Sequence, residues 1–549
     1  MNKIQTAVRV WCLILFFAIP LVVTPSLSID VFALPKTTLF VTSVLIIFLL
    51  LLLIPSYFVR LISDRTSLGI IFASFILSLV IGIANGLESE RIFGVHGRFN
   101  GLLTYVSLFY LVVIIRVLFK SEFVKEVLVV GSVTNLIVCV YFLLQVSKKD
   151  FLQWNNIYNA PSATLGNPNF VSGFLSTTAF CFLIFFTFDF RSRIKKYTFQ
   201  FVGAFGPLMS LFCIFLTDSA LGLASLLAGV SFLVFVFTIN RTRVVSLSRI
   251  KLKIGVPLLA SSCLFLMTFV AFKEKLALSS SISNRIYYWT VSLEALKQRP
   301  LLGYGFDSTA EFFRSTNRPN RFGSTFAADS SHNLLIDIAT WIGIPLTFLL
   351  VVVIIRVLYK ALSAIFIHHP FLSTQKIVFS SLIAFLVQSL ISVPTISLNI
   401  WGFGLFGCLL ILSDSKSFET RTLYSYPKLS KGMRILTTWA LILVLPLFPL
   451  RWKKDLDFRN LAEAGNGNEL INLVDRWPQD SFHYLTLTHS LYLSNQINLG
   501  QSVGKRGLDF NPKNYLLLEE MEKQDPDQLF KKEMRNRMAD INPLYSYQR

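Results

Sequence analysis

Long apolar stretches separated by short polar loops run through residues 1–450 of the chain. Many of them reach the roughly 20 apolar residues that a helix needs to cross a bilayer. Because these runs are continuous and do not alternate with polar residues, they predict helices and not the strands of a membrane barrel. We therefore predict an all-α polytopic membrane protein with about 13 transmembrane helices, at about residues 8–24, 38–59, 68–86, 101–119, 125–146, 169–188, 199–216, 219–239, 254–272, 334–358, 377–393, 398–412 and 435–450.

Basic residues gather in alternate loops, which predicts a cytoplasmic N-terminus by the positive-inside rule. The short loops on the other side hold only Lys36, Arg91, Arg98, Lys148 and Lys149. Two large polar segments then lie outside the cytoplasm: the loop 273–332 and the tail 451–549. We expect a membrane domain over 1–450 that contains this loop, a separate helical tail domain over 451–549, and a location in the inner (cytoplasmic) membrane.

The composition adds a net charge of +20 and six cysteines to this picture. The basic residues follow the membrane topology, so they do not indicate nucleic-acid binding. All six cysteines fall in apolar spans, which excludes a disulfide framework, and their spacing shows no metal-ligand pattern. We predict no metal and no cofactor. The pair Asp455 and Asp457 lacks a neighbouring histidine in the sequence and is interpreted as solvated charge.

The tail carries helical signals in the segments 475–478, 484–493, 500 and 509–512. They resemble tetratricopeptide-type helix pairs, although little more than one repeat is visible and such arrays usually need about three. A plain helical cap and a dedicated partner-binding array both remain open.

His332 is the strongest candidate for a catalytic residue. It lies in the run Ser330–Asn333, which closes the long polar loop and opens an apolar helix of about 25 residues. At a helix N-terminus the macrodipole disfavours the imidazolium form, and a neutral imidazole acts as a general base. Ser330 or Ser331 is expected to cap this helix.

Two arginines outside the cytoplasm are candidate ligands for a lipid diphosphate. Arg285 precedes a Tyr-Tyr-Trp cluster that ends at Trp289, and Arg98 lies in the loop before the span 101–119. The planar guanidinium group binds phosphate through two hydrogen bonds and keeps its charge at any working pH. Anchoring of the helix at the membrane interface is the alternative role.

Two further loop motifs complete the candidate site. Gly303 and Gly305 follow Pro300 and allow a tight turn with close backbone approach to a ligand. Asn167 and Asn169 flank Pro168, in a pattern that is equally typical of a turn and a helix cap. Asn333 follows His332 and is included as a candidate binding residue.

Taken in order, Arg285…Trp289, Pro300-x-x-Gly303-x-Gly305 and His332-Asn333…Gly343 resemble the signature of the O-antigen ligase and Wzy-type polymerase superfamily. The motifs around Arg98 and around Asn167 and Asn169 resemble others of that group. The resemblance covers roughly residues 69–412. It implies an inverting, metal-independent transfer of a glycan from a polyprenyl diphosphate carrier in the membrane to an acceptor hydroxyl. It also implies that His332 is catalytic and that Arg98 and Arg285 hold the diphosphate.

The chain departs from the family pattern at one position. Many members carry Ser-Arg-Gly at the start of a middle span, whereas here Ala220 follows Ser219. The resemblance then implies that this donor contact is missing or is supplied by Arg314 or Arg321. A ligase acting on a glycan, lipid or protein acceptor, a polymerase of repeat units, and a non-enzymatic permease or flippase remain open. The scarcity of charge inside the spans disfavours the last class.

Overall fold

The structure is a computed structural model that describes residues 3–86, 88–152, 160–189, 191–241, 280–316, 328–367, 372–413 and 428–542. Every regular element in these ranges is a helix, as predicted. The elements before the tail are α1 (Lys3–Leu21), α2 (Ala33–Leu53), α3 (Pro55–Ser63), α4 (Arg65–Asn85), α5 (Ser89–Phe93), α6 (Leu102–Leu118), α7 (Ser121–Val146), α8 (Pro168–Thr178), η1 (Ala179–Phe186), α9 (Arg193–Leu216), α10 (Ala220–Arg241), α13 (Ser280–Gln298), α14 (Thr309–Thr316), α15 (Leu334–Ile342), α16 (Ile344–Ile367), α17 (Thr374–Ser389), α18 (Ile396–Ser413) and α19 (Lys428–Val444).

Nine helical segments within the described residues are long and apolar enough to cross a membrane, or ten if one bent pair counts as a span. The chain is thus a multi-pass membrane protein. The predicted span 254–272 lies outside the described residues, so the predicted count of thirteen stays a prediction.

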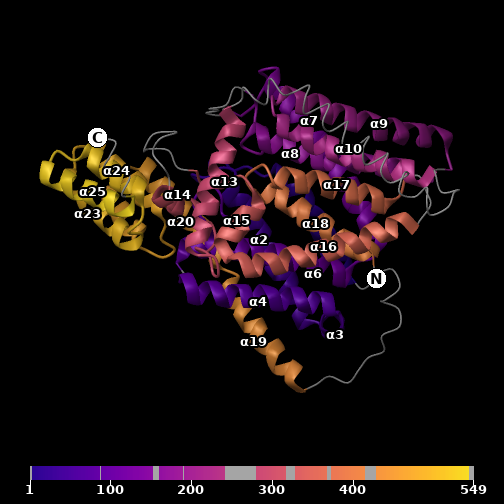
Figure 1. Cartoon of the computed structure of the whole chain (residues 1–549), viewed down its shortest axis with the longest axis horizontal. Helices are drawn as coiled ribbons and strands as arrows, with labels where there is room; N and C mark the ends of the chain where they lie inside the picture. Colours follow the sequence, from indigo (N-terminus) through magenta and orange to yellow (C-terminus); the bar gives the residue numbers. More distant parts are fainter. Residues whose placement is uncertain are drawn as a thin grey trace.

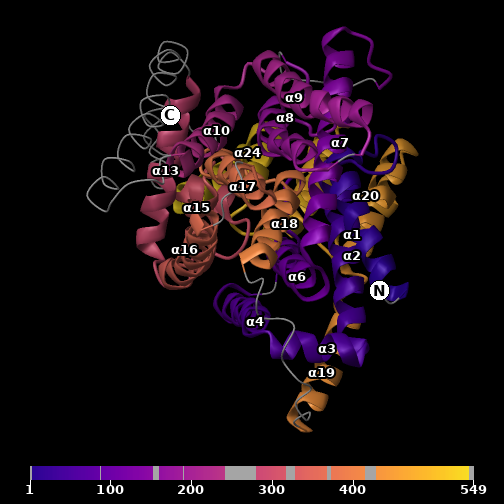
Figure 2. The same ribbon diagram turned by 90° about the vertical axis from the view of Figure 1, so that its right-hand side faces the viewer.

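Several of the long helices share one direction. In Figure 1, α6, α9, α10, α16 and α17 run along the long axis, the tail lies at one end, and the N-terminus lies towards the other. Viewed from that other end, the same helices form a bundle around α18, with α3 and α4 at its edge (Figure 2). α13 lies across the end of the bundle that carries the tail, which is called the tail-bearing end below.

Loops that were expected outside the cytoplasm contact one another at the tail-bearing end. Lys36 Nζ donates to the Thr164 carbonyl at 2.5 Å, and the Ser481 amide of the tail donates to Glu90 at 2.6 Å. Loops expected inside pair at the opposite end of the bundle. There, Arg116 binds Asp64 at 2.7 Å. These contacts group the loops at two ends of the bundle, and the sidedness of the two ends stays a prediction.

Two predicted spans are interrupted in the structure. The span 38–59 ends at Leu53, because Pro55 starts α3 and Asp64 then caps α4 by accepting from the Ser67 amide at 2.9 Å; α3 and α4 meet at 89°. The predicted helix 334–358 breaks at Gly343, whose φ of 82° favours glycine. The long helix predicted after Asn333 was therefore wrong, and a short α15 of nine residues carries the motif.

The tail continues directly from the membrane part, because α19 and α20 fall in one apolar segment, Arg434–Glu463. The boundary predicted at residue 450 thus falls inside a helix. Asp455 in this segment is fully buried and accepts a hydrogen bond from the Ile29 amide at 2.7 Å. The interpretation of Asp455 as solvated charge was wrong, because the partners that bury it are distant in sequence.

Six helices form the tail around an apolar core of their own. They are α20 (Leu447–Glu463), α21 (Gly467–Val474), α22 (Ser481–Leu493), α23 (Ile497–Phe510), α24 (Tyr515–Gln524) and α25 (Gln528–Ile541). The starts of α20, α22 and α24 follow one another at about 34 residues, the tetratricopeptide period, and three such pairs suffice for a stable array. Helix pairing is therefore more regular than the sequence signals indicated.

Candidate active site

The turn before His332 is held by a buried carboxylate. Asp337 of α15 is fully buried and accepts from the Ser330 hydroxyl at 2.6 Å, the Ser331 amide at 2.8 Å and the Ser331 hydroxyl at 2.7 Å. Asn333 caps α15 instead, because its side-chain oxygen accepts from the first amides of the helix. The expectation that Ser330 or Ser331 caps the helix was wrong, since Asp337 binds both hydroxyls.

His332 is forced into an unusual backbone conformation by this turn. Its φ is 57°, in the left-handed region that non-glycine residues rarely adopt. Such conformations persist only where surrounding contacts fix them, and they cluster at functional sites. The imidazole ring lies 5.1 Å from the ring of Tyr288, centroid to centroid. Tyr288 belongs to the aromatic cluster after Arg285, so the structure joins two motifs that the sequence presents separately.

The electrostatic surroundings of His332 favour a neutral ring. Burial lowers its pKa most; Asp329 acts in the opposite direction, and the charges of Arg285 and Arg98 lower it further, to about 4. Burial thus replaces the helix dipole as the main reason for a neutral base. Both predicted arginines lie near enough to His332 to lower its pKa, and the structure therefore brings the predicted base close to each of them.

Arg98 forms an ion pair that the sequence did not reveal. Its Nη2 lies 2.6 Å from Asp329 Oδ2, and its guanidinium carbon lies 5.8 Å from the centre of the Phe170 ring. Burial raises the pKa of Asp329, but the charge of Arg98 and its hydrogen bond favour the carboxylate, and the net pKa lies below its usual value. Asp329 is thus an anionic neighbour of both functional groups. The only sequence signal was its position three residues before His332.

The buried carboxylate of Asp307 fixes the backbone of the loop that contains Arg98. Asp307 is buried and accepts from the Val95 amide at 2.9 Å and from the Asn100 amide at 3.2 Å. Two glycines, Gly94 and Gly101, let the two ends of the loop touch, because a Cβ on either would meet the backbone of the other end within 2.7 Å. The loop is therefore a closed turn that holds Arg98 in place.

Arg285 and Trp289 lie one helical turn apart on α13. Arg285 is 6% exposed, and its Nε donates to the Ile391 carbonyl at 2.8 Å, which fixes the guanidinium group. The buried indole N–H of Trp289 has no hydrogen-bond partner among the described residues. A buried donor without a partner costs free energy unless a ligand or water completes it.

Gly303 and Gly305 pack against the end of α15. This packing explains why the turn contains glycine at both positions. The Tyr304 and Gly305 amides donate to the Thr340 and Trp341 carbonyls at 2.8 and 3.0 Å. A Cβ on Gly303 would lie 2.4 Å from the Thr340 oxygen, and the φ of Gly303 is 65°. The close backbone approach is therefore to the end of α15, and substrate binding by these glycines stays a prediction.

Asn167 and Asn169 order the start of α8 beside this site. Asn167 caps the helix by accepting from the Asn169 amide at 2.8 Å. Asn169 accepts from the Ser219 hydroxyl at 2.9 Å, next to Ala220, where α10 begins. The next residue, Phe170, contacts the Arg98 guanidinium group through its ring, so the fixed start of α8 also helps to position Arg98. Of the replacements considered for the family arginine, Arg321 and the side chain of Arg314 lie outside the described part.

The fold and site define a helical multi-pass membrane protein with a neutral histidine beside two arginines at one end of the bundle. Residues 205–351 match the family model described as O-antigen ligase. This segment, which includes α13, α15 and His332, is an O-antigen ligase family domain, and the resemblance to the ligase and polymerase superfamily is confirmed. No curated protein matches the chain.

Proposed function

We propose that the chain transfers a glycan from a polyprenyl diphosphate carrier to an acceptor hydroxyl on the extracytoplasmic face. The observation that carries this proposal is the neutral, partly buried His332 beside Arg98 and Arg285. The sidedness follows from the positive-inside rule, with the tail-bearing end outside, the N-terminus cytoplasmic and the protein in the inner membrane.

The reaction at this site is a single displacement. The guanidinium groups of Arg98 and Arg285 hold the diphosphate, and the acceptor oxygen attacks the anomeric carbon from the opposite face. The new carbon–oxygen bond forms as the bond to the diphosphate breaks, so the anomeric configuration inverts. His332 takes the acceptor proton, and the lipid diphosphate leaves with the electron pair. Because diphosphate is a good leaving group, no metal is required at the reacting carbon.

His332→Ala and His332→Gln test the assignment in proteoliposomes supplied with a defined polyprenyl-diphosphate oligosaccharide and candidate acceptors. A lost general base is expected to lower the rate about 10²- to 10⁴-fold. His489→Gln is the matched control, because His489 lies on the exposed side of the tail and pairs only with Glu520 at 2.7 Å among the described residues. Transfer at the normal rate by His332→Ala would contradict the proposal, as would a rate that depends on added Mg²⁺ or Mn²⁺.

Product analysis separates the remaining activities. A ligase attaches the donor glycan once to a lipid, glycan or protein acceptor, the last being a protein O-oligosaccharyltransferase. A Wzy-type polymerase lengthens the chain repeat by repeat on its carrier. Movement of an intact donor across the bilayer, with no new glycosidic bond, would instead indicate a permease or flippase.

A further inference from the structure

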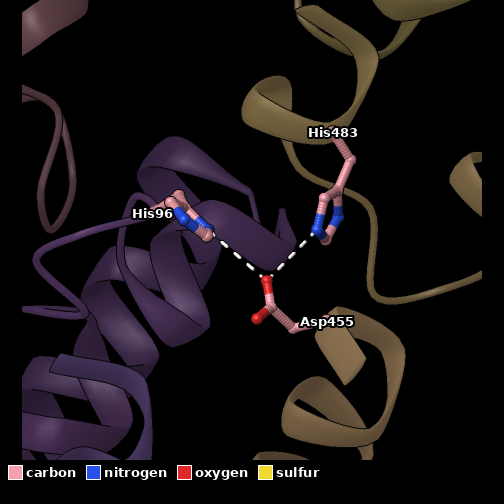
Figure 3. A group of neighbouring side chains, drawn as sticks. All are labelled: His96, Asp455 and His483. Carbon is pink, nitrogen blue, oxygen red and sulfur yellow. Dashed lines mark hydrogen bonds and ion pairs between the residues drawn. The ribbon is translucent and has the colours of Figure 1, made fainter. Parts of the chain in front are cut away.

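Two histidines and an aspartate from distant parts of the chain converge at the junction of the tail and the membrane part. Asp455 Oδ1 lies 3.8 Å from His96 Nδ1 and 3.3 Å from His483 Nε2. All three ligand atoms lie within 4.8 Å of one another. Figure 3 shows both rings directed at the same carboxylate oxygen, with His96 from the loop after α5, Asp455 from α20 and His483 from α22.

Two of these groups, His483 and Asp455, are oriented by further contacts on the side away from the cluster. His483 Nδ1 lies 2.7 Å from Asp480, which in turn pairs with Arg451 at 2.8 Å. The other oxygen of Asp455 accepts from the Ile29 amide at 2.7 Å. A carboxylate bound to the far nitrogen of a histidine is the usual support for a metal-bound imidazole, because it fixes the ring and its tautomer.

The rings are also held by stacking and by burial. His96 stacks on Phe482 at 3.8 Å and His483 on Phe458 at 4.4 Å, centroid to centroid. The side chains of Asp455 and His483 are fully buried, and that of His96 is 11% exposed. His96 Nδ1 has no hydrogen-bond partner among the described residues, although it is buried and directed at Asp455. A cation between the three groups would satisfy this nitrogen.

We propose that His96, Asp455 and His483 bind a divalent transition-metal ion of the zinc class. Zinc binds imidazole nitrogen and carboxylate oxygen at about 2.0–2.2 Å in a tetrahedral arrangement, so two ligand atoms of one ion lie about 3.3–3.6 Å apart. The contact of His483 with Asp455 already has this spacing, the contact of His96 is slightly longer, and the two rings need to approach by up to about 1.5 Å. Two imidazole ligands in three disfavour Mg²⁺ and Ca²⁺, which prefer oxygen.

The ion at this site acts as a clamp and takes no part in glycan transfer. His96 lies two residues before Arg98 in the closed loop of the candidate active site, whereas Asp455 and His483 belong to the tail helices. Binding would therefore fix the tail to the loop that presents Arg98. The prediction of no metal, made from sequence spacing, is replaced by this proposal, because ligands from three separate segments leave no local motif.

The test measures metal content of the purified full-length protein, without any donor. After saturation with Zn²⁺ and removal of free ions, elemental analysis is expected to find about one Zn²⁺ per chain. His96→Gln and Asp455→Asn are expected to lose it, while His489→Gln on α22 retains it. Asp480→Asn keeps the N-cap of α22 but removes the carboxylate behind His483, and should weaken binding about 10- to 100-fold. Co²⁺ in place of Zn²⁺ should give the absorption of a four-coordinate site.

Hydrogen exchange measures the clamp itself. Removal of the ion is expected to increase exchange in the segments around His96 and His483 without changing exchange within α6 or α18. Wild-type protein that retains no Zn²⁺, or an Asp455→Asn variant that is monodisperse and retains as much as wild type, would overturn the proposal. The three groups would then form a hydrogen-bonded cluster held by protons.

Discussion

Acidification to pH 5 is expected to leave the kcat/KM of glycan transfer nearly unchanged. The pKa of His332 is lowered to about 4, mainly by burial. With that pKa, about 90% of the rings are neutral at pH 5, whereas an ordinary histidine with a pKa near 6.5 would be only about 3% neutral. The two cases differ about 30-fold in the fraction of active base at pH 5, which is easily measured.

The assay follows initial rates in proteoliposomes from pH 4 to pH 8 at low donor concentration, where kcat/KM reports groups of the free enzyme. A sugar diphosphate joined to a lipid carries no group that titrates near pH 6, so the donor does not contribute an inflexion there. The expected profile is flat between pH 8 and pH 5 and falls to half near pH 4. Size-exclusion profiles at each pH verify that the protein remains folded. A half-maximal rate near pH 6.5 in protein that stays folded would refute the reasoning, because it would place His332 in an environment like water.

Substitutions at Arg98, Gly303 and Asn333 test individual parts of the site. Arg98→Lys removes the planar fork but keeps the charge, so the KM for the donor should rise about 10- to 100-fold; an unchanged KM would contradict its role in diphosphate binding. Gly303→Ala should lower thermal stability more than Gly97→Ala: both add strain of about 1–3 kcal/mol, but only the first places a Cβ against the Thr340 oxygen. Equal melting temperatures would contradict the packing argument. In chemical denaturation, Asn333→Ala should cost about 0.5–2 kcal/mol of unfolding free energy and Asn333→Asp much less; equal losses in the two variants would contradict the capping role.

The clustering of His332, Arg98 and Arg285 could be predicted because the sequence places all three between spans, in segments that the charge pattern predicts to lie on the same side of the membrane. The presence of Asp329 in this cluster could not be predicted from the sequence. Asp329 pairs with Arg98 across 231 residues of sequence, and nothing local distinguishes it from other loop carboxylates. The same holds for His483, whose partners His96 and Asp455 come from other segments.

The interruptions of the predicted spans could not be read from hydropathy, for a different reason. Hydropathy measures composition, and the run 334–358 is apolar apart from Asp337, Arg356 and two threonines. The break at Gly343 results from backbone conformation and from the segment that packs there. The Ile344 amide donates to the Pro300 carbonyl at 2.8 Å, so the loop before α14 occupies the place where a continuous helix would run. Only little more than one tail repeat could be predicted, because the regular spacing of about 34 residues lies in the starts of α20, α22 and α24.

A base with a pKa near 4 is weak, but binding of the donor is expected to raise the pKa of His332. Arg98 and Arg285 lower the pKa of His332, whereas the negative charge of Asp329 raises it. A diphosphate bound between the arginines adds negative charge near His332, as Asp329 does, and offsets the positive charge of the guanidinium groups. The pKa of His332 should therefore rise towards the working pH once the donor is bound, which strengthens the base when it is needed. The inflexion in kcat is then expected at a higher pH than that in kcat/KM, and coincident inflexions would show that the diphosphate binds away from these arginines.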